Sequence, residues 1–226
     1  MNRRSSFNLM INLEQTMAIT YEIMQSGDSE EVAELIGDIF MKYEPMTICN
    51  KVDPKKMILL LKYLTAYSAE VGLIAIARDH ETGKIVGAIT NKDYQLAPTP
   101  NLPEKYHSYI EMFKADIAMC HELERVLDYR EYKVGELFQP FHLCVLPDYT
   151  RQGIAKELVA QSLKIAKSKG YKSAMAECSV VPSRRAFESN GYQLINSINY
   201  EDFSYNNIKT YATIPGALVM VYKETI

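Results

Sequence analysis

The chain has 226 residues, of which 47% are hydrophobic and 23% charged, with a formal net charge of −3. This length can bury a substantial core, and the composition is typical of a soluble globular protein. A weakly negative charge gives no electrostatic reason to expect nucleic acid or an anionic membrane as a partner. No apolar run approaches the roughly 20 residues that a membrane span needs.

Residues 1–17 contain two arginines but no continuous apolar stretch, so we expect a loose leader there, no signal peptide, and one domain over 18–226. The cysteines are scattered, without a C-x-x-C pair and without the Cys and His spacing that suggests a zinc site. This pattern favours reduced thiols in a cytoplasmic protein and argues against a metal site. The cysteines are Cys49, Cys120, Cys144 and Cys178.

The first predicted strand is 18–25, and a helix is predicted over 27–45. Asp28 is the expected N-cap of that helix, Glu31 would complete a capping box, and Pro45 would end the helix. Its apolar face comprises Val32, Leu35, Ile36, Ile39, Phe40 and Tyr43.

A second helix is predicted over 53–70, with Asp53 as cap and Pro54 at the first helical position. Two apolar runs within 71–94 flank the turn 80–83 and predict a hairpin with Gly83 at its late position. A loop with three prolines follows, and 104–130 is predicted to be mostly helical.

The second half alternates between strands and helices. Residues 135–147 are apolar over most of their length, as in a central strand buried on both faces. The elements that follow predict an α/β domain with a mixed sheet. They are a helix over 153–170, a strand over 171–180, a short helix over 182–191, and strands over 192–201 and 216–226.

The stretch LPDYTRQGIAKEL, residues 146–158, joins a strand to a helix through Gly153. A helix N-terminus presents unpaired N–H groups and a partial positive charge, and glycine lets a ligand approach the backbone closely. Arg151 and Gln152 add donors that suit a pyrophosphate. The P-loop and dinucleotide-binding glycine patterns are both absent. By itself the turn could equally be a plain strand-to-helix junction.

Its surroundings favour the anion site. HLCVLPDYTRQGIAKEL, AKSKGYKSAMAECS and AFESNGYQL together resemble the acetyl-CoA core of the GNAT N-acetyltransferase superfamily, over roughly residues 139–195. The resemblance implies a mixed, mostly antiparallel sheet flanked by helices, with acetyl-CoA as co-substrate and no metal. The first turn position, usually Gln or Arg in the family, is Thr150 here. The implied cofactor-binding residues are Leu143, Cys144, Val145, Arg151, Gln152, Gly153, Ile154 and Ala155.

Three further segments, IFMKYEPMT, ECSVVPSRRAFESNGY and INYEDF, look like the insect-type arylalkylamine N-acetyltransferases, which include dopamine N-acetyltransferase. In that family the Glu before Pro at the end of the first helix is the general base, and this position is Glu44. Two serines with assigned catalytic roles fall on Ser179 and Ser183. Many GNAT enzymes use a Tyr as general acid where this chain has Phe187, which cannot donate a proton.

The chemistry explains why a carboxylate is wanted. An alkylamine with a pKa near that of Lys is neutral in only about one molecule in 10³ at pH 7, a barrier of about 4–5 kcal/mol. A carboxylate such as Glu44 can accept that proton, directly or through water. The alternative is that Glu44 is only a solvated residue at a helix end. Ser183, or Ser179 before Pro182, could likewise only cap the short helix.

Several alternatives for the acceptor stay open. Aromatic and apolar side chains near the first two helices, Phe40, Tyr43, Met46 and Tyr63, suit an arylalkylamine, although core packing would also account for each. A polyamine or a protein amine is a second possible acceptor class, and a weakly catalytic acyl-CoA sensor is a third reading. We expect direct attack without an acyl-enzyme, a backbone N–H near Val145 facing the thioester, and a monomer or weak dimer.

Overall fold

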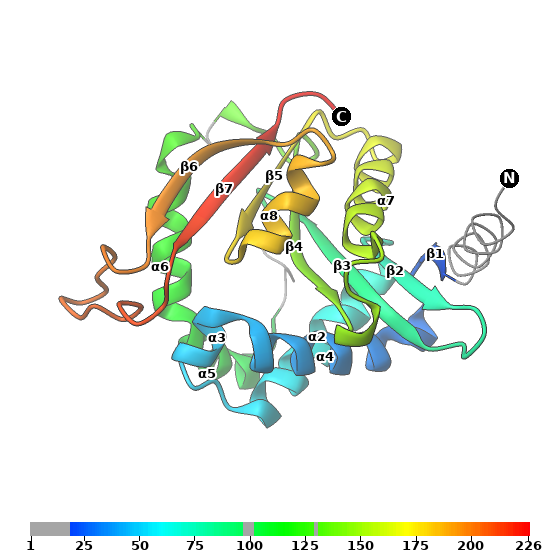
Figure 1. Ribbon diagram of the computed structural model, residues 1–226, viewed down its shortest axis with the longest axis horizontal. Coiled ribbons are helices and arrows are strands. Elements are labelled where there is room, and N and C mark those ends of the chain that lie inside the picture. Colours follow the sequence, from blue (N-terminus) through cyan, green and yellow to red (C-terminus); the bar gives the residue numbers. More distant parts are fainter. Residues whose placement is uncertain (1–18, 97–101, 129–130) are drawn as a thin grey trace, which may run out of the picture.

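One seven-stranded sheet organises the residues that the structure describes, 19–96, 102–128 and 131–226, while the expected leader lies outside them. This computed structural model orders the strands β1-β2-β3-β4-β5-β7-β6 (Figure 1). Only β4 and β5 run parallel, which confirms the mixed, mostly antiparallel sheet. The strands are β1 Ile19–Ile23, β2 Ile74–Asp79, β3 Ile85–Asp93, β4 Leu137–Val145, β5 Ser173–Cys178, β6 Gln193–Asn199 and β7 Ala217–Lys223.

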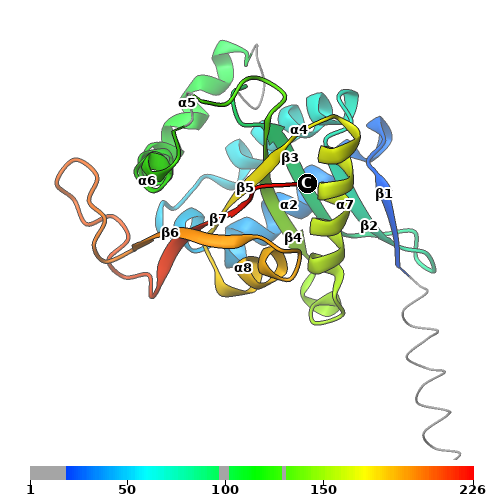
Figure 2. The ribbon, with the colours of Figure 1, turned by 90° about the horizontal axis from the view of Figure 1, so that it is seen from above.

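Helices cover both faces of the sheet (Figures 1 and 2). α7 (Ile154–Ser168) and α8 (Val181–Glu188) pack on one face through an apolar cluster that includes Phe138 and Val221. The opposite face is covered by α2 (Ser29–Tyr43) and α4 (Pro54–Glu70) over β2 and β3, and by α6 (Lys114–Leu123) over β5 and β7. The sheet therefore separates two layers of helices that differ in their elements and in their apolar clusters.

The predicted helical segment after the prolines is a series of short pieces before and after α6. They are η2 Glu104–Tyr106, α5 His107–Ile110, η3 Glu111–Phe113 and η4 Glu124–Val126. The mostly helical prediction for 104–130 is confirmed for these residues, and its last two positions lie outside the described part. The helix α6 lays its buried Met119 and Leu123 on the sheet.

Gly37 lies where α2 packs on α4. A Cβ added at Gly37 would lie 2.3 Å from Ile58 Cδ1, so the end of the Ile58 side chain would have to move to make room for it. The start of α4 is as predicted: the Asp53 carboxylate accepts from the N–H groups of Lys55 (2.9 Å) and Lys56 (3.1 Å), with Pro54 at the first position.

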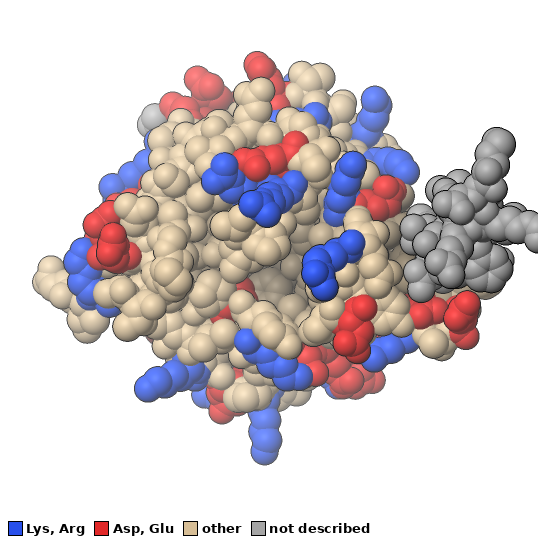
Figure 3. Space-filling view, in the orientation of Figure 1, with Lys and Arg blue, Asp and Glu red and all other residues tan. Residues whose placement is uncertain are grey.

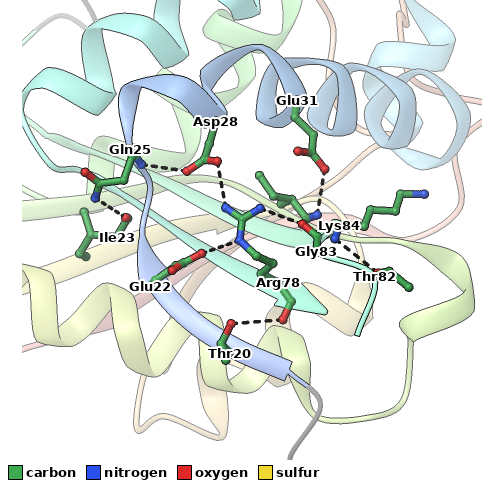
Figure 4. Close-up of polar contacts among 11 residues, drawn as sticks. Thr20, Glu22, Ile23, Gln25, Asp28, Glu31, Arg78, Thr82, Gly83 and Lys84 are labelled. Atoms are coloured by element: carbon green, nitrogen blue, oxygen red, sulfur yellow. Dashed lines mark hydrogen bonds and ion pairs between the residues drawn. The ribbon is translucent and has the colours of Figure 1, made fainter. Parts of the chain in front are cut away.

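The predicted capping box at the start of α2 is wrong. Asp28 is the N-cap residue by position, but its carboxylate makes no cap bond and instead pairs with Arg78 at 2.9 Å and accepts from the Gln25 N–H at 3.1 Å (Figure 4). Glu31 accepts from the Ile85 N–H across the fold at 2.9 Å. The half-buried Arg78 guanidinium on β2 pairs with both Glu22 and Asp28, and it joins β1 and the start of α2 to the hairpin.

The expectation that β4 is buried on both faces along its length is only half right. Its first four residues are buried, whereas Phe141 is 42% exposed. The hairpin between β2 and β3 turns through Gly83 at φ +71°, as predicted. Within the described ranges, we find no helix long and apolar enough to cross a membrane, and no group of three His, Cys, Asp or Glu side chains placed to hold a metal.

Candidate active site

The sheet opens between β4 and β5, and we call this opening the splay. Pairing joins Leu137 to Ser173 and Phe138 to Ala174 and then stops within these two fully described strands, although β4 continues to Val145 and β5 to Cys178. Two strands that diverge in this way leave one edge of β4 without a neighbour.

The main-chain groups on that free edge can be assigned from the bonds on the other edge. The Leu146 N–H donates to the Val86 carbonyl at 2.8 Å, and the His142 N–H donates to Thr90 Oγ1 at 3.1 Å. Because the amides of a strand point alternately to its two edges, those of Leu143 and Val145 face the splay. They offer donors and acceptors to an extended ligand lying where another strand would pair.

The turn after β4 leads directly into α7. Gly153 is the N-cap of α7 with φ +84°, and Arg151 also has positive φ, at +61°. The first helical bond runs from the Glu157 N–H to the Gly153 carbonyl at 3.0 Å, so the amides before it lack an intrahelical partner. A Cβ on Gly153 would have no atom within 4 Å, which leaves the space above these amides open.

Two side chains hold this turn in shape. The Tyr149 hydroxyl donates to Asp79 Oδ2 at 2.6 Å, and this bond helps keep the pKa of the Asp79 carboxyl below its ordinary value. Thr150, the position that departs from the family pattern, donates its hydroxyl to the Pro147 carbonyl at 2.8 Å. Thr150 therefore stabilises the turn itself, and the free backbone amides remain available for an anion.

The outer surface on this side is hollowed and carries charges of both signs. Figure 3 shows the face that carries α7 and α8, with a hollow near its centre and both basic and acidic side chains around it.

Glu44 stands at the junction of two helices. The helix α2 ends at Tyr43, and Pro45 does end it, but Pro45 also begins the short helix α3 (Pro45–Cys49). Glu44 is the N-cap of α3: its carboxylate accepts from Met46 N–H at 3.3 Å and Thr47 N–H at 2.6 Å. Its charge therefore lies at the positive end of a helix, where a carboxylate is favourable.

A buried polar group lies next to Glu44. Asp116 accepts from Asn50 Nδ2 at 2.6 Å and from the Tyr211 hydroxyl, and its burial, with the Glu44 charge as a smaller contribution, raises the pKa of its carboxyl to about 6. Burial is the main cause that raises the pKa of the Tyr200 phenol, and the negative charge of Glu44 raises it further. These residues were not predicted, because they come from segments far apart in sequence.

The two predicted serines flank the end of β5. Ser179 follows the strand directly, and its carbonyl accepts from the Tyr200 hydroxyl at 2.9 Å, which links it to the Glu44 neighbourhood. Ser183 lies in α8 and donates to the Val180 carbonyl at 2.8 Å. The N-cap of α8 is Val180, without a side-chain cap bond, so neither serine caps this helix.

The residues expected to form an acceptor wall lie in three places. Phe40 meets His142 edge-on, with ring centroids 5.1 Å apart, at the point where β4 bends. Met46 is buried among aromatic residues near β6 and β7. Tyr43 is 57% exposed, and Tyr63 packs on Tyr106 beside α5.

His142 itself was not predicted. Burial lowers the pKa of its imidazole to about 4, so the ring is neutral near pH 7, and its Nδ1 lies 2.9 Å from Thr90 Oγ1. An isolated histidine in a predicted strand gives no sign in the sequence that its ring will be buried and neutral.

The comparisons with known proteins agree with this geometry. Residues 36–192 match the family model described as Acetyltransferase (GNAT) family, which is well over half of the chain. The chain belongs to this family. The match includes Glu44, the splay, the turn and α8, and it ends at Tyr192.

Solved structures share the fold at low sequence identity. The C-terminal condensation domain of Ebony, solved with β-alanyl-dopamine, has a TM-score of 0.76 and 15% identity, covering 92% of this chain and 99% of its own. Arylalkylamine N-acetyltransferase 2 from Aedes aegypti follows at 0.73 and 19%, covering 91% and 98%. Drosophila melanogaster polyamine N-acetyltransferase, described as forming N-acetylagmatine, scores 0.70 at 18%, covering 91% and 99%.

Proposed function

We propose that this protein transfers an acetyl group from acetyl-CoA to the primary amine of a small molecule. The observation that carries the proposal is the β4–β5 splay, which opens beside the αL turn at the start of α7. An extended ligand with a diphosphate fits this combination, because one end meets strand amides and the other meets helix amides. Membership of an acetyltransferase family supports the same ligand.

On the cofactor side, the amides around Gly153, Ile154 and Ala155 hold the pyrophosphate, with Arg151 and Gln152 as additional donors. The free edge of β4 at Leu143, Cys144 and Val145 binds the pantetheine chain. The Val145 N–H faces the splay and can stabilise the negative charge that develops on the thioester oxygen.

On the acceptor side, Glu44 takes the proton from the ammonium, directly or through water, so that the neutral amine can attack. Its carboxylate is held in place by the two amides of α3, at 3.3 and 2.6 Å, and each oxygen keeps a further lone pair. Ser179 and Ser183, at the end of β5, would orient the thioester or protonate the departing thiolate.

Direct attack is favoured over an acyl-enzyme. Cys144 and Cys178 lie on the strands that border the splay, but both are buried, and burial raises the pKa of each thiol to about 12. A thiol with so high a pKa supplies almost no thiolate at neutral pH, and therefore it is a poor nucleophile.

The acceptor class within primary amines has two candidates. The resemblance to the insect enzymes favours an arylalkylamine such as dopamine or tyramine, and the aromatic pair of Phe40 and His142 supports a ring nearby. A polyamine is the second candidate, because buried carboxylates line the face opposite the cofactor.

Release of CoA thiol is the direct test, measured with acetyl-CoA and dopamine, tyramine, serotonin, spermidine or a lysine peptide. Release with a small amine supports the proposal. Release with the peptide alone would replace the small-molecule acceptor by a protein. Tight acetyl-CoA binding without release for any amine would leave a cofactor-binding sensor and refute the enzymatic function.

A further inference from the structure

A side-chain hydrogen bond joins β4 to β5 at the place where the two strands part. Gln139 on β4 donates its Nε2 to Glu177 Oε2 on β5 at 2.8 Å. The last backbone pair of these strands is Phe138 with Ala174. In that register Gln139 lies opposite Met175, two residues before Glu177. The side-chain bond is therefore diagonal, and it links the strands beyond the last backbone pair.

Both side chains lie on the α6 face of the sheet. Successive residues of a strand point to opposite faces, so Gln139 shares the face of Leu137. By the same rule Glu177 shares the face of Met175. Leu137 and Met175 belong to the apolar cluster that α6 covers. The bond thus spans the two strands from the side opposite α7 and α8, and it leaves the free edge of β4 unobstructed.

A second carboxyl lies beside Glu177. Glu124, in η4 after α6, is buried and interacts with Glu177 through a side-chain hydrogen bond as well as by charge. A hydrogen bond between two carboxyl groups requires a proton on one of them. Glu124 Oε2 already accepts from the Tyr94 hydroxyl at 3.0 Å, and the Lys92 ammonium interacts favourably with the Glu124 charge. The proton therefore belongs to Glu177.

The surroundings of Glu177 favour its neutral form. Its Oε1 atom is buried, and no donor from the residues that the structure describes reaches it. An ionised oxygen in this position would be uncompensated, whereas a protonated carboxyl is itself the donor. Burial, and next the neighbouring Glu124, raise the pKa of Glu177 to about 8, although Lys92 opposes this shift. The carboxyl is neutral at pH 7 for these reasons.

The groups that face Glu177 come from four elements besides Gln139 on β4. Lys92 lies on β3 and Glu124 in η4, and the ammonium of Lys92 offsets the charge of one carboxylate. Cys120 of α6 is a buried thiol whose pKa is raised well above its ordinary value, so it stays neutral. Met220 pairs with Glu177 from β7. One lysine thus faces two carboxyls, which suits one charged and one neutral carboxyl.

We propose that Glu177 is a positioning residue for the cofactor: its neutral carboxyl bonds Gln139 and Glu124 together, and this link sets the spacing of β4 and β5 at the start of the splay. The inference rests on the proposed function, because acetyl-CoA is the ligand that the splay would hold. When Glu177 loses its proton to solvent, two adjacent carboxylates face one lysine, and their repulsion disrupts the link. The spacing that fits the cofactor therefore belongs to the protonated protein.

Affinity for acetyl-CoA should follow the protonation of Glu177. With a pKa of about 8, about nine in ten molecules carry the proton at pH 7 and about one in ten at pH 9. Because only the protonated form has the fitting splay, the apparent Kd should rise about tenfold between these pH values. Acetyl-CoA has no free thiol to titrate in this range. Calorimetry of acetyl-CoA binding without an amine measures the rise and needs no turnover.

Three variants separate the link from other causes. Glu177→Gln keeps the size of the side chain and both of its bonds but cannot ionise, so its Kd should match the natural protein at pH 7 and stay constant to pH 9. Glu122→Gln removes an exposed carboxyl from the same helical segment and should keep the tenfold rise. Gln139→Leu removes the cross-strand bond and should raise Kd by about tenfold already at pH 7.

A pH-dependent rise of equal size in Glu177→Gln would overturn the inference, and so would a constant Kd in the natural protein. An unchanged Kd at pH 7 in Gln139→Leu would also contradict it. Thiol release measured on the same samples separates this role from the proposed function. The predicted pH dependence of binding without release for any amine supports the positioning role and refutes the enzymatic function. Release combined with a pH-independent Kd keeps the function and refutes the role, and no acetyl-CoA binding at any pH refutes both.

Discussion

Glu44 caps α3 and is the proposed general base, and these two roles can be separated by substitution. As the N-cap of α3 it accepts two amide bonds, and loss of such a cap typically costs about 0.5–2 kcal/mol. As a general base it should contribute about 10²–10⁴-fold to the rate. Glu44→Gln keeps an acceptor oxygen for the cap but cannot take a proton, so it removes the second role and keeps most of the first.

The chain offers a matched control for the cap. Asp53 precedes Pro54 at the start of α4 as Glu44 precedes Pro45, and its carboxylate also accepts from two amides of the first turn. Asp53 is exposed and belongs to no part of the proposed site. Asp53→Ala should therefore lower the free energy of unfolding by about 1 kcal/mol, or the Tm by about 2–4 °C, and leave kcat/KM unchanged.

The assay is thiol release across a pH series with both variants, combined with thermal unfolding. Glu44→Gln should lose about 10²–10⁴-fold in kcat/KM, together with the limb of the pH profile that the base produces, while its Tm stays close to that of the natural sequence. An unchanged pH profile in Glu44→Gln would refute the assignment of Glu44 as the base. A comparable loss of kcat/KM in Asp53→Ala would show that helix stability, and not proton transfer, sets the rate.

Three more predictions follow from single positions. Gly153→Ala should lower the free energy of unfolding by about 1–2 kcal/mol, because φ at this position is +84°, and it should raise the KM for acetyl-CoA. Gly83 has φ +71° and also has space for a Cβ, so Gly83→Ala should lower the free energy of unfolding as much but leave that KM unchanged. Equal KM values for the two variants would contradict the anion site. The pKa of Asp116 is raised to about 6, so its ionisation destabilises the fold as the pH rises from about 4 to 6. In urea unfolding, the free energy of unfolding of Asp116→Asn should therefore increase relative to the natural sequence by up to about 3 kcal/mol between pH 4 and 7. A difference that stays constant with pH would show that the pKa of Asp116 is ordinary. Tyr192→Phe removes a buried hydroxyl without a described partner, and should leave the unfolding free energy unchanged or higher by about 1 kcal/mol; a clear loss would mean that the hydroxyl is bonded.

The turn proposed to bind the cofactor could be predicted as a strand-to-helix turn, because it is local in sequence. A strand, a polar turn, Gly153 and an amphipathic helix occupy one continuous stretch, and the amides that the turn exposes are main-chain groups. Main-chain groups do not depend on side-chain identity, so the Thr150 departure leaves the turn intact.

At Pro45 the sequence pattern predicted the end of one helix correctly but missed the start of the next. A proline both ends a preceding helix and starts a new one favourably, and the sequence pattern was interpreted only in the first sense. The structure uses both, so the Glu44 carboxylate caps a following helix and does not lie in solvent at a helix end. The capping box at Asp28 failed for a different reason, since Arg78, fifty residues away, forms the ion pairs that decide it.

The side chains around Glu44 could not be predicted, because only the tertiary structure brings them together. Asp116 interacts electrostatically with Glu44, and Glu124 with Glu177, across separations of more than fifty residues and without a spacing that a motif could record. One signal was present: Gln139 and Glu177 are polar residues within strands that are mostly apolar. A charged or amide side chain in a buried strand needs a partner, and here Glu177 interacts with Glu124, which lies in the segment between β3 and β4. The sheet lies between the turn at the start of α7 and the side chains of α6, because the two pack on opposite faces. A substitution in α6 should therefore leave the conformation of that turn unchanged.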